Sequence, residues 1–261
     1  MRIVTEPEVY VVGRQTVNSA EVERFLADHD TSWSTETEKG AEYLAEMAGR
    51  VCYMSFGAKQ GRKSNADYLS NIIDSGHGSV LEHGVWNFVI TGVSRSFTHE
   101  LIRHRAGWGY SQLSQRYVDE SDTDFVEPDI IAQDPEAHQL WLETVQASHA
   151  AYCKLVDRVN LIVEGLHPQL SRTAKRKMAR QSARSVLPNA TETKIFVTAN
   201  ARALRHFVEL RGGEGAEPEI RKVAVKVLKI MREEAPNIFR DFEIVSLDDG
   251  TQGVATGHHK V

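Results

Sequence analysis

The strongest structural signal in the sequence is a long helical segment at residues 134–164. Asp134 is a favourable N-cap, and Pro135 follows at the first helical position, where a proline has no intrahelical hydrogen bond to lose. Gly165 and Pro168 then predict the end of the helix. Any fold of this chain must therefore accommodate one long helix over these residues.

Shorter helical and strand-like segments surround this helix. Apolar spacing and capping residues predict helices over 19–27, 41–53, 65–75, 171–187, 200–211 and 218–235. Runs rich in β-branched and aromatic residues predict strands over 9–13, 85–93, 194–198 and 242–247. Because the 261 residues contain no repeat and no linker, we expect a single mixed domain of the α+β class over residues 1–250, with a central β-sheet packed by helices. Residues 251–261 are expected to form a disordered tail.

The overall composition excludes several classes of protein. Lys and Arg number 31 against 36 Asp and Glu, a net charge of −5, which argues against wrapping nucleic acid polymers or binding a membrane surface. Two cysteines, Cys52 and Cys153, make no disulfide framework and favour a reducing compartment. No secretory signal pattern or long apolar run occurs, so we expect a cytoplasmic protein.

Residues 103–116 form the densest group of polar donors in the chain. Arg103, His104 and Arg105 stand at the end of a helical pattern, and a glycine-punctuated loop then carries Ser111, Gln112, Ser114, Gln115 and Arg116. Guanidinium groups suit phosphate, amides and hydroxyls suit phosphate or carbonyl edges, and glycines permit close approach of the backbone. The alternative is a solvated helix end followed by a polar loop. The continuation of donors through Arg116 favours a nucleotide site.

Two further basic segments leave their interpretation open. Residues 171–187 hold six Lys or Arg and no acid, which is typical of a solvated helix face, although Arg184 at its end could point into a pocket. On the segment 200–211, Arg202 and His206 share one helix face by their i,i+4 spacing. An ordinary surface is an equal alternative for that pair.

Metal and covalent catalysis have little support in the sequence. His99 and His104 lie five residues apart, whereas a zinc-binding helix needs histidines at i and i+4, so we expect no metal site. Cys52 and Cys153 lie in apolar helical patterns that are typical of core positions, not of activated nucleophiles. The glycine motifs of Rossmann folds and P-loops are absent.

Several segments match one known family in fixed order. The pattern Arg103-His104-Arg105 followed by Ser114 resembles the signature of flavin-dependent thymidylate synthases. The similarity extends through 49–53, 77–83, 98–105, 110–118, 183–193 and 200–211, and so covers about residues 40–247. The chain resembles the actinobacterial branch of that family most closely.

The resemblance implies the activity, the cofactors and the assembly. Members of this family are methyltransferases that convert dUMP to dTMP, with methylenetetrahydrofolate as the carbon donor and NADPH as the reductant of a bound FAD. Reduced flavin supplies the hydride, so no cysteine nucleophile is required. The family fold further implies a homotetramer whose active sites form between subunits.

The resemblance also assigns site residues. The positions that align with flavin contacts are Ser79, Arg103, His104, Arg105, Gln112, Asn200, Ala201, Arg202 and His206. The positions that align with dUMP contacts are Glu100, Leu101, Ile102, Arg103, Gln112, Leu113, Ser114, Gln115, Arg116, Arg184 and Arg211. Among these, Ser114, Arg116 and Arg184 suit the phosphate. Arg211 is the catalytic candidate, because a guanidinium can stabilise an ionised uracil ring although it cannot act as a base.

The sequence departs from the family pattern in two places. The loop between Arg105 and Ser114 is one residue longer than in many members, and residues 212–218 replace a stretch that commonly holds a histidine and a glutamine. An alternative is therefore a flavoprotein of the same fold with altered or lost methylation chemistry. A second alternative is a non-catalytic nucleotide or RNA-binding module that uses the arginines of residues 172–184.

Overall fold

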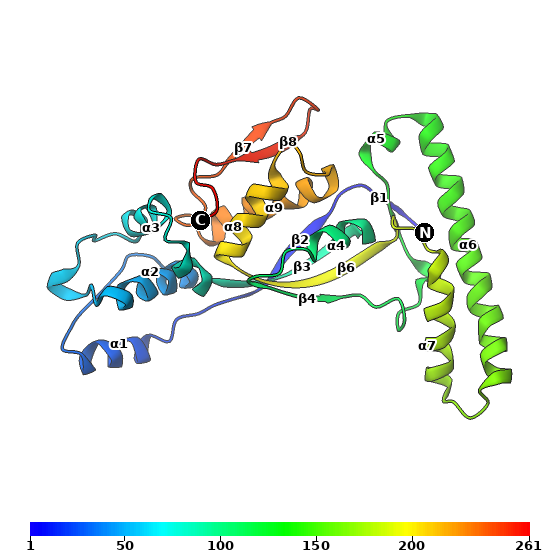
Figure 1. Ribbon diagram of the computed structural model, residues 1–261, viewed down its shortest axis with the longest axis horizontal. Helices are drawn as coiled ribbons and strands as arrows, with labels where there is room; N and C mark the ends of the chain where they lie inside the picture. Colours follow the sequence, from blue (N-terminus) through cyan, green and yellow to red (C-terminus); the bar gives the residue numbers. More distant parts are fainter. The chain divides into compact units, whose positions relative to one another are not determined.

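The computed structural model describes residues 1–261, which divide into two compact units. Unit 1 comprises residues 1–8, 90–101 and 111–195, and unit 2 comprises residues 9–89, 102–110 and 196–261. The chain mixes strands with helices, which confirms the α+β class (Figure 1). The strands are β1 (Ile3–Val4), β2 (Glu8–Arg14), β3 (Val85–Ser94), β4 (Trp108–Gln112), β5 (Phe125–Val126), β6 (Glu192–Asn200), β7 (Glu243–Ser246) and β8 (Gln252–Ala255). The helices are α1 (Ser19–Asp28), α2 (Gly40–Tyr53), α3 (Asn65–Asp74), α4 (Arg95–Leu101), α5 (Asp129–Ala132), α6 (Pro135–Leu166), α7 (Arg172–Ala183), α8 (Ala201–Gly212) and α9 (Pro218–Glu234).

The largest sheet has four strands in the order β2–β3–β6–β4. Alternate residues of β3 are buried, among them Trp86, Phe88 and Ile90, as expected for a strand with one face against the core. Two smaller sheets complete the strands: β1 pairs with β5 in parallel, and β7 pairs with β8 in antiparallel. The predicted strands at 9–13, 85–93, 194–198 and 242–247 all have counterparts in the structure.

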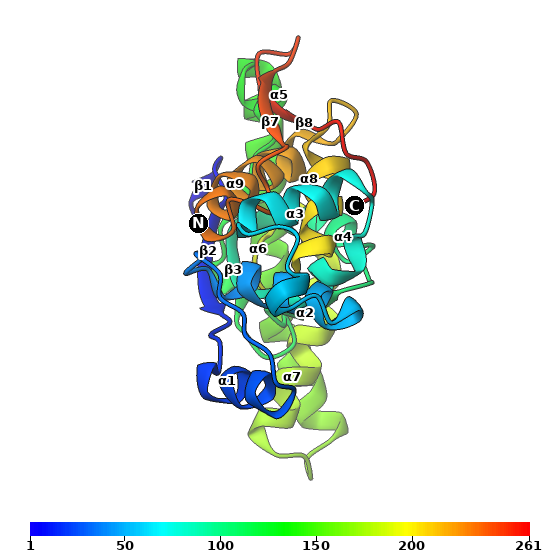
Figure 2. The ribbon, with the colours of Figure 1, turned by 90° about the vertical axis from the view of Figure 1, so that its left-hand side faces the viewer.

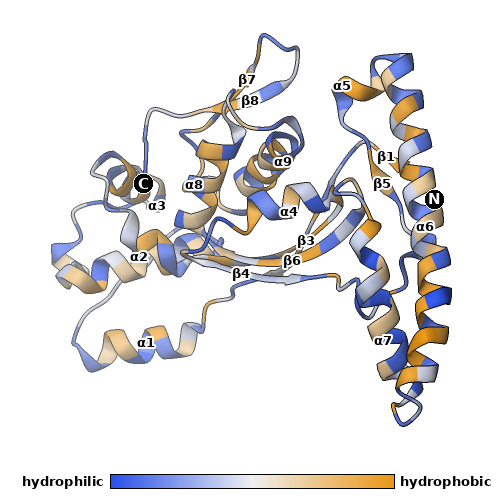
Figure 3. Ribbon diagram, turned by 45° about the vertical axis from the view of Figure 1, so that its right-hand side comes forward, coloured by the Kyte–Doolittle hydropathy of each residue, from blue (hydrophilic) through white to orange (hydrophobic).

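Unit 1 is built around the long helix that the sequence predicts. The Asp134 carboxylate accepts a hydrogen bond from the Ala137 N–H at 2.8 Å, and Pro135 opens α6 as expected. Helix α7, capped by Ser171, packs along α6 (Figures 1 and 3). The predicted helix over 171–187 ends earlier, at Ala183, and a 3₁₀ turn covers Arg184–Val186. No helix of the chain combines the length and the apolar content needed to span a bilayer.

Unit 2 contains two pairs of packed helices, α2 with α3 and α8 with α9. Apolar residues of α9 recur at helical spacing, and Ile220, Val223, Val227 and Met231 are all buried as that spacing predicts. Helix α8 packs against α9, and the β7–β8 hairpin contacts both helices (Figure 1). Figure 2 shows α2 and α3 beside each other, and they are also in contact.

The end of the chain differs from the expectation of disorder over residues 251–261. Residues 252–255 form β8, and Val254 is buried. The Thr256 hydroxyl donates to the Asp241 carboxylate at 2.6 Å. The Gly- and Thr-rich composition suggested no partner for this segment, but β7 and α8 both supply hydrogen bonds to it.

A buried ion pair links three parts of unit 2. Arg205 of α8 is 1 % exposed, and its Nη1 lies 2.6 Å from the Asp241 carboxylate. Arg205 also donates to the carbonyl oxygens of Ile238 at 2.5 Å and Val261 at 3.2 Å. Burial alone would raise the pKa of Asp241, but the hydrogen bonds and charge of Arg205 outweigh it and lower that pKa.

We predict that Asp241→Ala lowers the free energy of unfolding by about 3–5 kcal/mol, because it leaves the Arg205 guanidinium buried without a counter-charge. Urea denaturation followed by circular dichroism measures this loss. The matched control is Asp248→Ala at an exposed carboxylate, which should change stability by less than about 0.5 kcal/mol. Equal stability of the two variants would contradict a structural role for the pair.

Candidate functional site

A cavity of about 660 Å³ in unit 2 gathers much of the predicted site. Its walls are rich in cationic and aromatic side chains. They comprise Glu82, Arg103, His104, Arg105, Ala106, Gly107, Trp108, Asn200, Arg202, Ala203, His206, Leu210, Arg211, Lys260 and Val261. Four arginines around aromatic rings make this cavity suited to a flat ligand that carries negative charge.

The loop after α4 is held in place by the first turn of α8. Asn200 caps α8 by accepting the Ala203 N–H at 2.8 Å, and the Asn200 N–H donates to the Gly107 carbonyl at 3.1 Å. Gly107 has a φ of +76°, and a Cβ there would lie 2.6 Å from Asn200 Nδ2 and 2.9 Å from Ala203 Cβ. Only glycine fits, so this contact fixes where Arg103, His104 and Arg105 enter the cavity.

His104 and Arg211 form the polar centre of the cavity. Arg211 Nε donates to His104 Nε2 at 3.1 Å, and the His104 side chain is 7 % exposed. Burial, with the positive charge of Arg211, lowers the pKa of His104 from 6.5 to about 4. His104 is therefore neutral at pH 7 and accepts at Nε2, which places its proton on Nδ1.

Aromatic rings surround this imidazole. The ring of Phe207 lies 5.4 Å from that of His104, and the rings of His206 and Trp108 lie at 5.7 and 5.9 Å. Tyr110 stacks on Trp108 and donates from its hydroxyl to the His104 carbonyl at 2.7 Å. These contacts restrict the rotation of His104 and so fix the direction from which it faces Arg211.

Ser79 lies in an adjoining cavity of about 310 Å³, which Arg202 also lines. Arg202 Nη1 donates to Glu82 at 2.6 Å, so this arginine already has an anionic partner. Ala201, another predicted contact, has a fully buried side chain at the start of α8. The structure thus brings the flavin-contact candidates of unit 2, apart from the buried Ala201, to the walls of these two adjoining cavities.

Cys52 lines the same adjoining cavity and is exposed, so the prediction that it is a core residue was wrong. It lies in the last turn of α2, where Val51, Cys52 and Tyr53 are all exposed. The apolar pattern of α2 continues in the sequence to Tyr53, but the helix is buried only as far as Arg50. Cys153 of α6 is half-buried.

A second group of predicted residues lies in unit 1, around several buried polar atoms without partners. These atoms are Arg95 Nη1, Gln115 Nε2, Arg116 Nε and Glu120 Oε1. Gln115 and Glu120 are only 5 % and 3 % exposed. Burial and then the charge of Arg184 lower the pKa of Arg95, while the carboxylate of Glu120 opposes that shift. Buried groups normally find partners, and neighbouring guanidiniums repel, so the donors of this cluster on Arg95, Gln115 and Arg116 are suited to an anion. The Glu120 oxygen is an acceptor and gives such an anion no donor.

The other predicted substrate contacts in unit 1 have structural partners. Gln112 Nε2 donates to the hydroxyls of Thr98 at 3.1 Å and Thr193 at 3.3 Å. The Leu113 N–H donates to the Lys194 carbonyl oxygen at 2.9 Å, and the Ser114 hydroxyl accepts from the Arg116 N–H at 3.4 Å. The Leu101 side chain is fully buried, whereas Glu100 is half-buried. In unit 2, Ile102 is exposed.

Sequence reasoning missed three residues that the structure places at these sites. Arg95 begins α4 beside its cap Ser94, and a lone arginine there gave no signal. The glycines on either side of Trp108 predict a loop, although this residue begins β4. Lys260 lies in the segment expected to be disordered, so composition pointed away from it.

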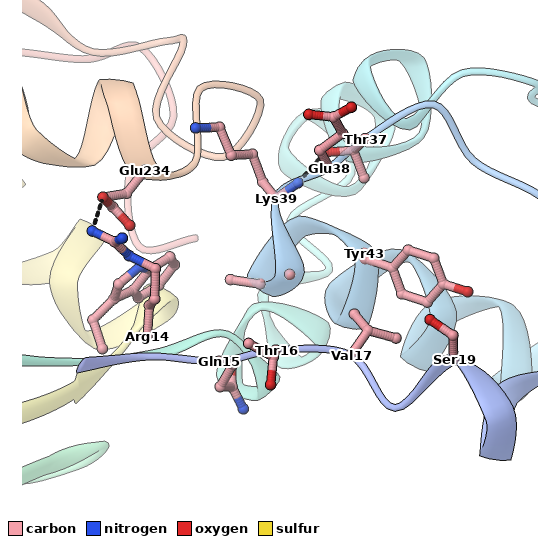
Figure 4. Close-up of a pocket in the computed structure, with 13 residues that line it drawn as sticks. Arg14, Gln15, Thr16, Val17, Ser19, Thr37, Glu38, Lys39, Tyr43 and Glu234 are labelled. Carbon is pink, nitrogen blue, oxygen red and sulfur yellow. Dashed lines mark hydrogen bonds and ion pairs between the residues drawn. The ribbon is translucent and has the colours of Figure 1, made fainter.

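A third cavity of unit 2, about 510 Å³, holds none of the predicted site residues. Figure 4 shows Arg14 paired with Glu234, at 2.7 Å, with Lys39 and Tyr43 coming from the start of α2. Of the two cations that line this cavity, Arg14 is thus already neutralised. The cavity with Arg103–Arg105 remains the better candidate.

Comparison with known proteins identifies the family of the chain. The family model described as thymidylate synthase complementing protein matches residues 35–237. A flavin-dependent thymidylate synthase of Mycolicibacterium vanbaalenii is 51 % identical over 233 residues, which are 89 % of this chain and 91 % of that protein. The enzyme of the same name from Mycobacterium avium is 49 % identical over the same coverage. Both relatives are mycobacterial, as the predicted actinobacterial resemblance requires.

A solved structure shares the fold at lower identity. The UMP/dUMP methylase PolB from Streptomyces cacaoi, bound with 5-Br dUMP, superposes with a TM-score of 0.63 at 20 % identity. The superposition covers 92 % of this chain and 96 % of PolB. It supports the fold as predicted.

We predict that the free energy of unfolding rises between pH 4 and pH 6.5 because of His104. The pKa of this group is about 4 when folded and 6.5 when unfolded, so only the unfolded state takes up a proton in this window. The two pKa values correspond to a contribution of about 3 kcal/mol, present above pH 6.5 and lost as the pH falls to 4. The unfolding free energy, measured by urea denaturation at each pH, should therefore depend less on pH for His104→Gln than for the wild type. An unchanged dependence on pH would show that His104 is not buried in the neutral form.

Proposed function

Because the chain belongs to the thymidylate synthase complementing protein family, we propose that it is a flavin-dependent thymidylate synthase that methylates dUMP to dTMP. The observation that carries this proposal is the cavity in which Arg103, His104 and Arg105 meet Arg211. Methylenetetrahydrofolate is the carbon donor and NADPH the reductant in this proposal. The relatives named flavin-dependent thymidylate synthase support the flavin.

The residues of the main cavity fit FAD. Arg103 and Arg105 supply guanidiniums for its diphosphate, and Asn200 and Gly107 form a close backbone contact at the cavity wall. Trp108, His104 and His206 supply apolar ring surface for a flat heterocycle. When bound, the flavin supplies hydride chemistry that no side chain can provide.

The cluster in unit 1 fits the phosphate of dUMP. A phosphate ester that is close to dianionic can accept from Arg95, Arg116 and the Ser114 hydroxyl, and it would screen the repulsion between Arg95 and Arg184. The buried Gln115 amide offers a further donor. The phosphate thus provides partners for atoms that otherwise lie buried without any.

Arg211 acts electrostatically in this mechanism. Uracil C5 becomes nucleophilic as negative charge develops on the ring, and a fixed guanidinium stabilises that charge. The neutral His104 accepts one Arg211 N–H, so it orients the guanidinium without adding a competing positive charge. A guanidinium stays protonated throughout, so Arg211 stabilises the anion and does not remove a proton.

The assembly is proposed to be a homotetramer with active sites between subunits. Helix α6 displays large apolar side chains to solvent in the single chain, and Figure 3 shows hydrophobic residues along its length. Leu140, Leu161 and Leu166 are 68, 61 and 69 % exposed. Exposed leucines of this kind on one helix favour contact with another subunit.

The alternatives receive less support. The arginines of residues 172–184 do not form a continuous basic face, because Arg180 pairs with Asp119 at 2.6 Å and Arg184 lies beyond the end of α7. This weakens the case for an RNA-binding module. One observation favours a flavoprotein with altered chemistry: no residue of 212–218, the segment that departs from the family pattern, lines the main cavity.

Tritium release tests the proposal directly. Purified protein should contain FAD and release tritium from 5-tritiated dUMP when methylenetetrahydrofolate and NADPH are present. Arg211→Ala should retain most of its flavin but lose activity by about 10²–10³-fold, since it removes a donor to the developing anion. Cys52→Ser should still release tritium at a measurable rate.

Two results would contradict the proposal. Protein that neither contains FAD nor can be reconstituted with it lacks the cofactor that the reaction needs. Flavin-loaded protein that releases no tritium would instead favour the altered flavoprotein. A folded Cys52→Ser variant without any activity would argue for covalent catalysis.

Arg95 provides a separate prediction for substrate binding. Arg95→Met should weaken dUMP binding by about 10–100-fold, because a charge-assisted hydrogen bond to phosphate is worth about 1.5–3 kcal/mol. Binding of deoxyuridine, which lacks the phosphate, should not change. Titration calorimetry measures both, with Arg172→Met as the control for loss of an exposed charge on α7. Equal weakening for both ligands would place Arg95 outside the phosphate site.

A further inference from the structure

The last residues of the sequence are bound to α8 at several points. His259 Nδ1 lies 2.9 Å from the Glu209 carboxylate, and the Lys260 N–H donates to the other oxygen of that carboxylate at 3.1 Å. The Val261 oxygen accepts from the buried Arg205 guanidinium at 3.2 Å. We call Thr256–Val261 the tail segment. The two residues that hold its last part, Glu209 and Arg205, lie on α8, the helix that also provides Arg202 and Arg211.

The tail segment closes against Gly78, next to Ser79. Val261 is 7 % exposed. A Cβ at Gly78 would lie 3.0 Å from the Val261 carbonyl carbon and 3.2 Å from Arg202 Nε. A side chain at residue 78 would therefore push away either the tail segment or Arg202, and glycine permits both to approach.

Lys260 and Val261 line the main cavity together with Arg103, Arg105 and Arg202. Lys260 has a φ of +63°, a conformation that residues other than glycine seldom adopt. Its own N–H is bound to Glu209, and the next residue is bound to Arg205, so hydrogen bonds on both sides hold this backbone in place. The unusual conformation is thus imposed where the side chain reaches the cavity.

The charge of Lys260 is available to a ligand. No carboxylate lies within ion-pair distance of its ammonium, whereas Arg202 in the same cavity is paired with Glu82 at 2.6 Å. Glu209 binds the Lys260 backbone and not its side chain. An exposed ammonium at the rim of a cationic cavity strengthens the attraction of an anion to that cavity.

We propose that the tail segment is a wall of the flavin cavity and that Lys260 binds the diphosphate of FAD. This inference rests on the proposed function. The family model ends at residue 237, so the tail segment lies outside the matched region. Lys260 is the contacting residue, and Glu209 is a positioning residue that acts through the tail backbone.

Titration of the apoprotein with FAD, followed by flavin fluorescence, tests the proposal. Lys260→Met should raise the dissociation constant about tenfold, and Lys260→Arg should restore most of the affinity because it keeps the charge. The matched control is Lys229→Met, which removes a cation of the same unit whose ammonium binds Gln252 and does not line the cavity. That control should bind FAD as wild type does.

A double-mutant cycle distinguishes contact from general destabilisation. If Glu209 acts by positioning Lys260, Glu209→Ala should weaken FAD binding in the wild-type background but have little further effect in the Lys260→Met background. Additive losses would show that Glu209 acts separately from Lys260.

The outcomes separate this inference from the function on which it rests. Wild-type protein that binds no FAD overturns the proposed function. Wild-type protein that binds FAD, together with a Lys260→Met variant of the same affinity, overturns the role of Lys260 alone. Equal weakening by Lys260→Met and Lys229→Met would also overturn it, since the effect would then come from net charge.

Discussion

The contact between Gly107 and the first turn of α8 determines the arrangement of the main cavity. The Asn200 side chain caps α8 while its N–H binds the Gly107 carbonyl, so one residue starts the helix and docks the loop that carries Arg103, His104 and Arg105. Because α8 is a rigid helix, the same contact sets the distance from His104 to Arg211 nearly three turns later.

The electrostatics of unit 2 follow from which charges are paired inside the protein. Arg205 is buried and fully committed to Asp241 and to carbonyl oxygens, so it supports the fold. Arg103 and Arg105 instead line a cavity, and the histidine between them is kept neutral by burial. The arginines of α8 and of the loop after α4 thus divide into those that support the fold and those that face a ligand cavity. Sequence alone cannot make this division, because Arg202 and Arg205 lie three residues apart on one helix.

The sequence predicted what depends on local signals. The cap and proline of α6, the apolar spacing of α9 and the Asn200 start of α8 are encoded within one or two helical turns, and the structure has each of them. Cys52 and the tail segment were misjudged because their surroundings come from distant residues: packing of α2 ends before Cys52, and the tail is bound by Glu209 and Arg205. Arg95 was missed for the same reason, since only the fold brings it near Arg184.

Each unit holds polar or charged groups that suit an anionic ligand. A folded chain usually pairs its buried polar atoms, yet Arg95, Gln115 and Arg116 retain buried atoms without partners. In unit 2, Lys260 holds an unusual backbone conformation at the rim of a cationic cavity. Buried donors without partners lower the stability of the chain alone, and an anion bound in unit 1 offsets this loss because it supplies the missing acceptors. The ligands are then part of what makes this arrangement of charges stable, so their binding and the stability of the native state must be coupled.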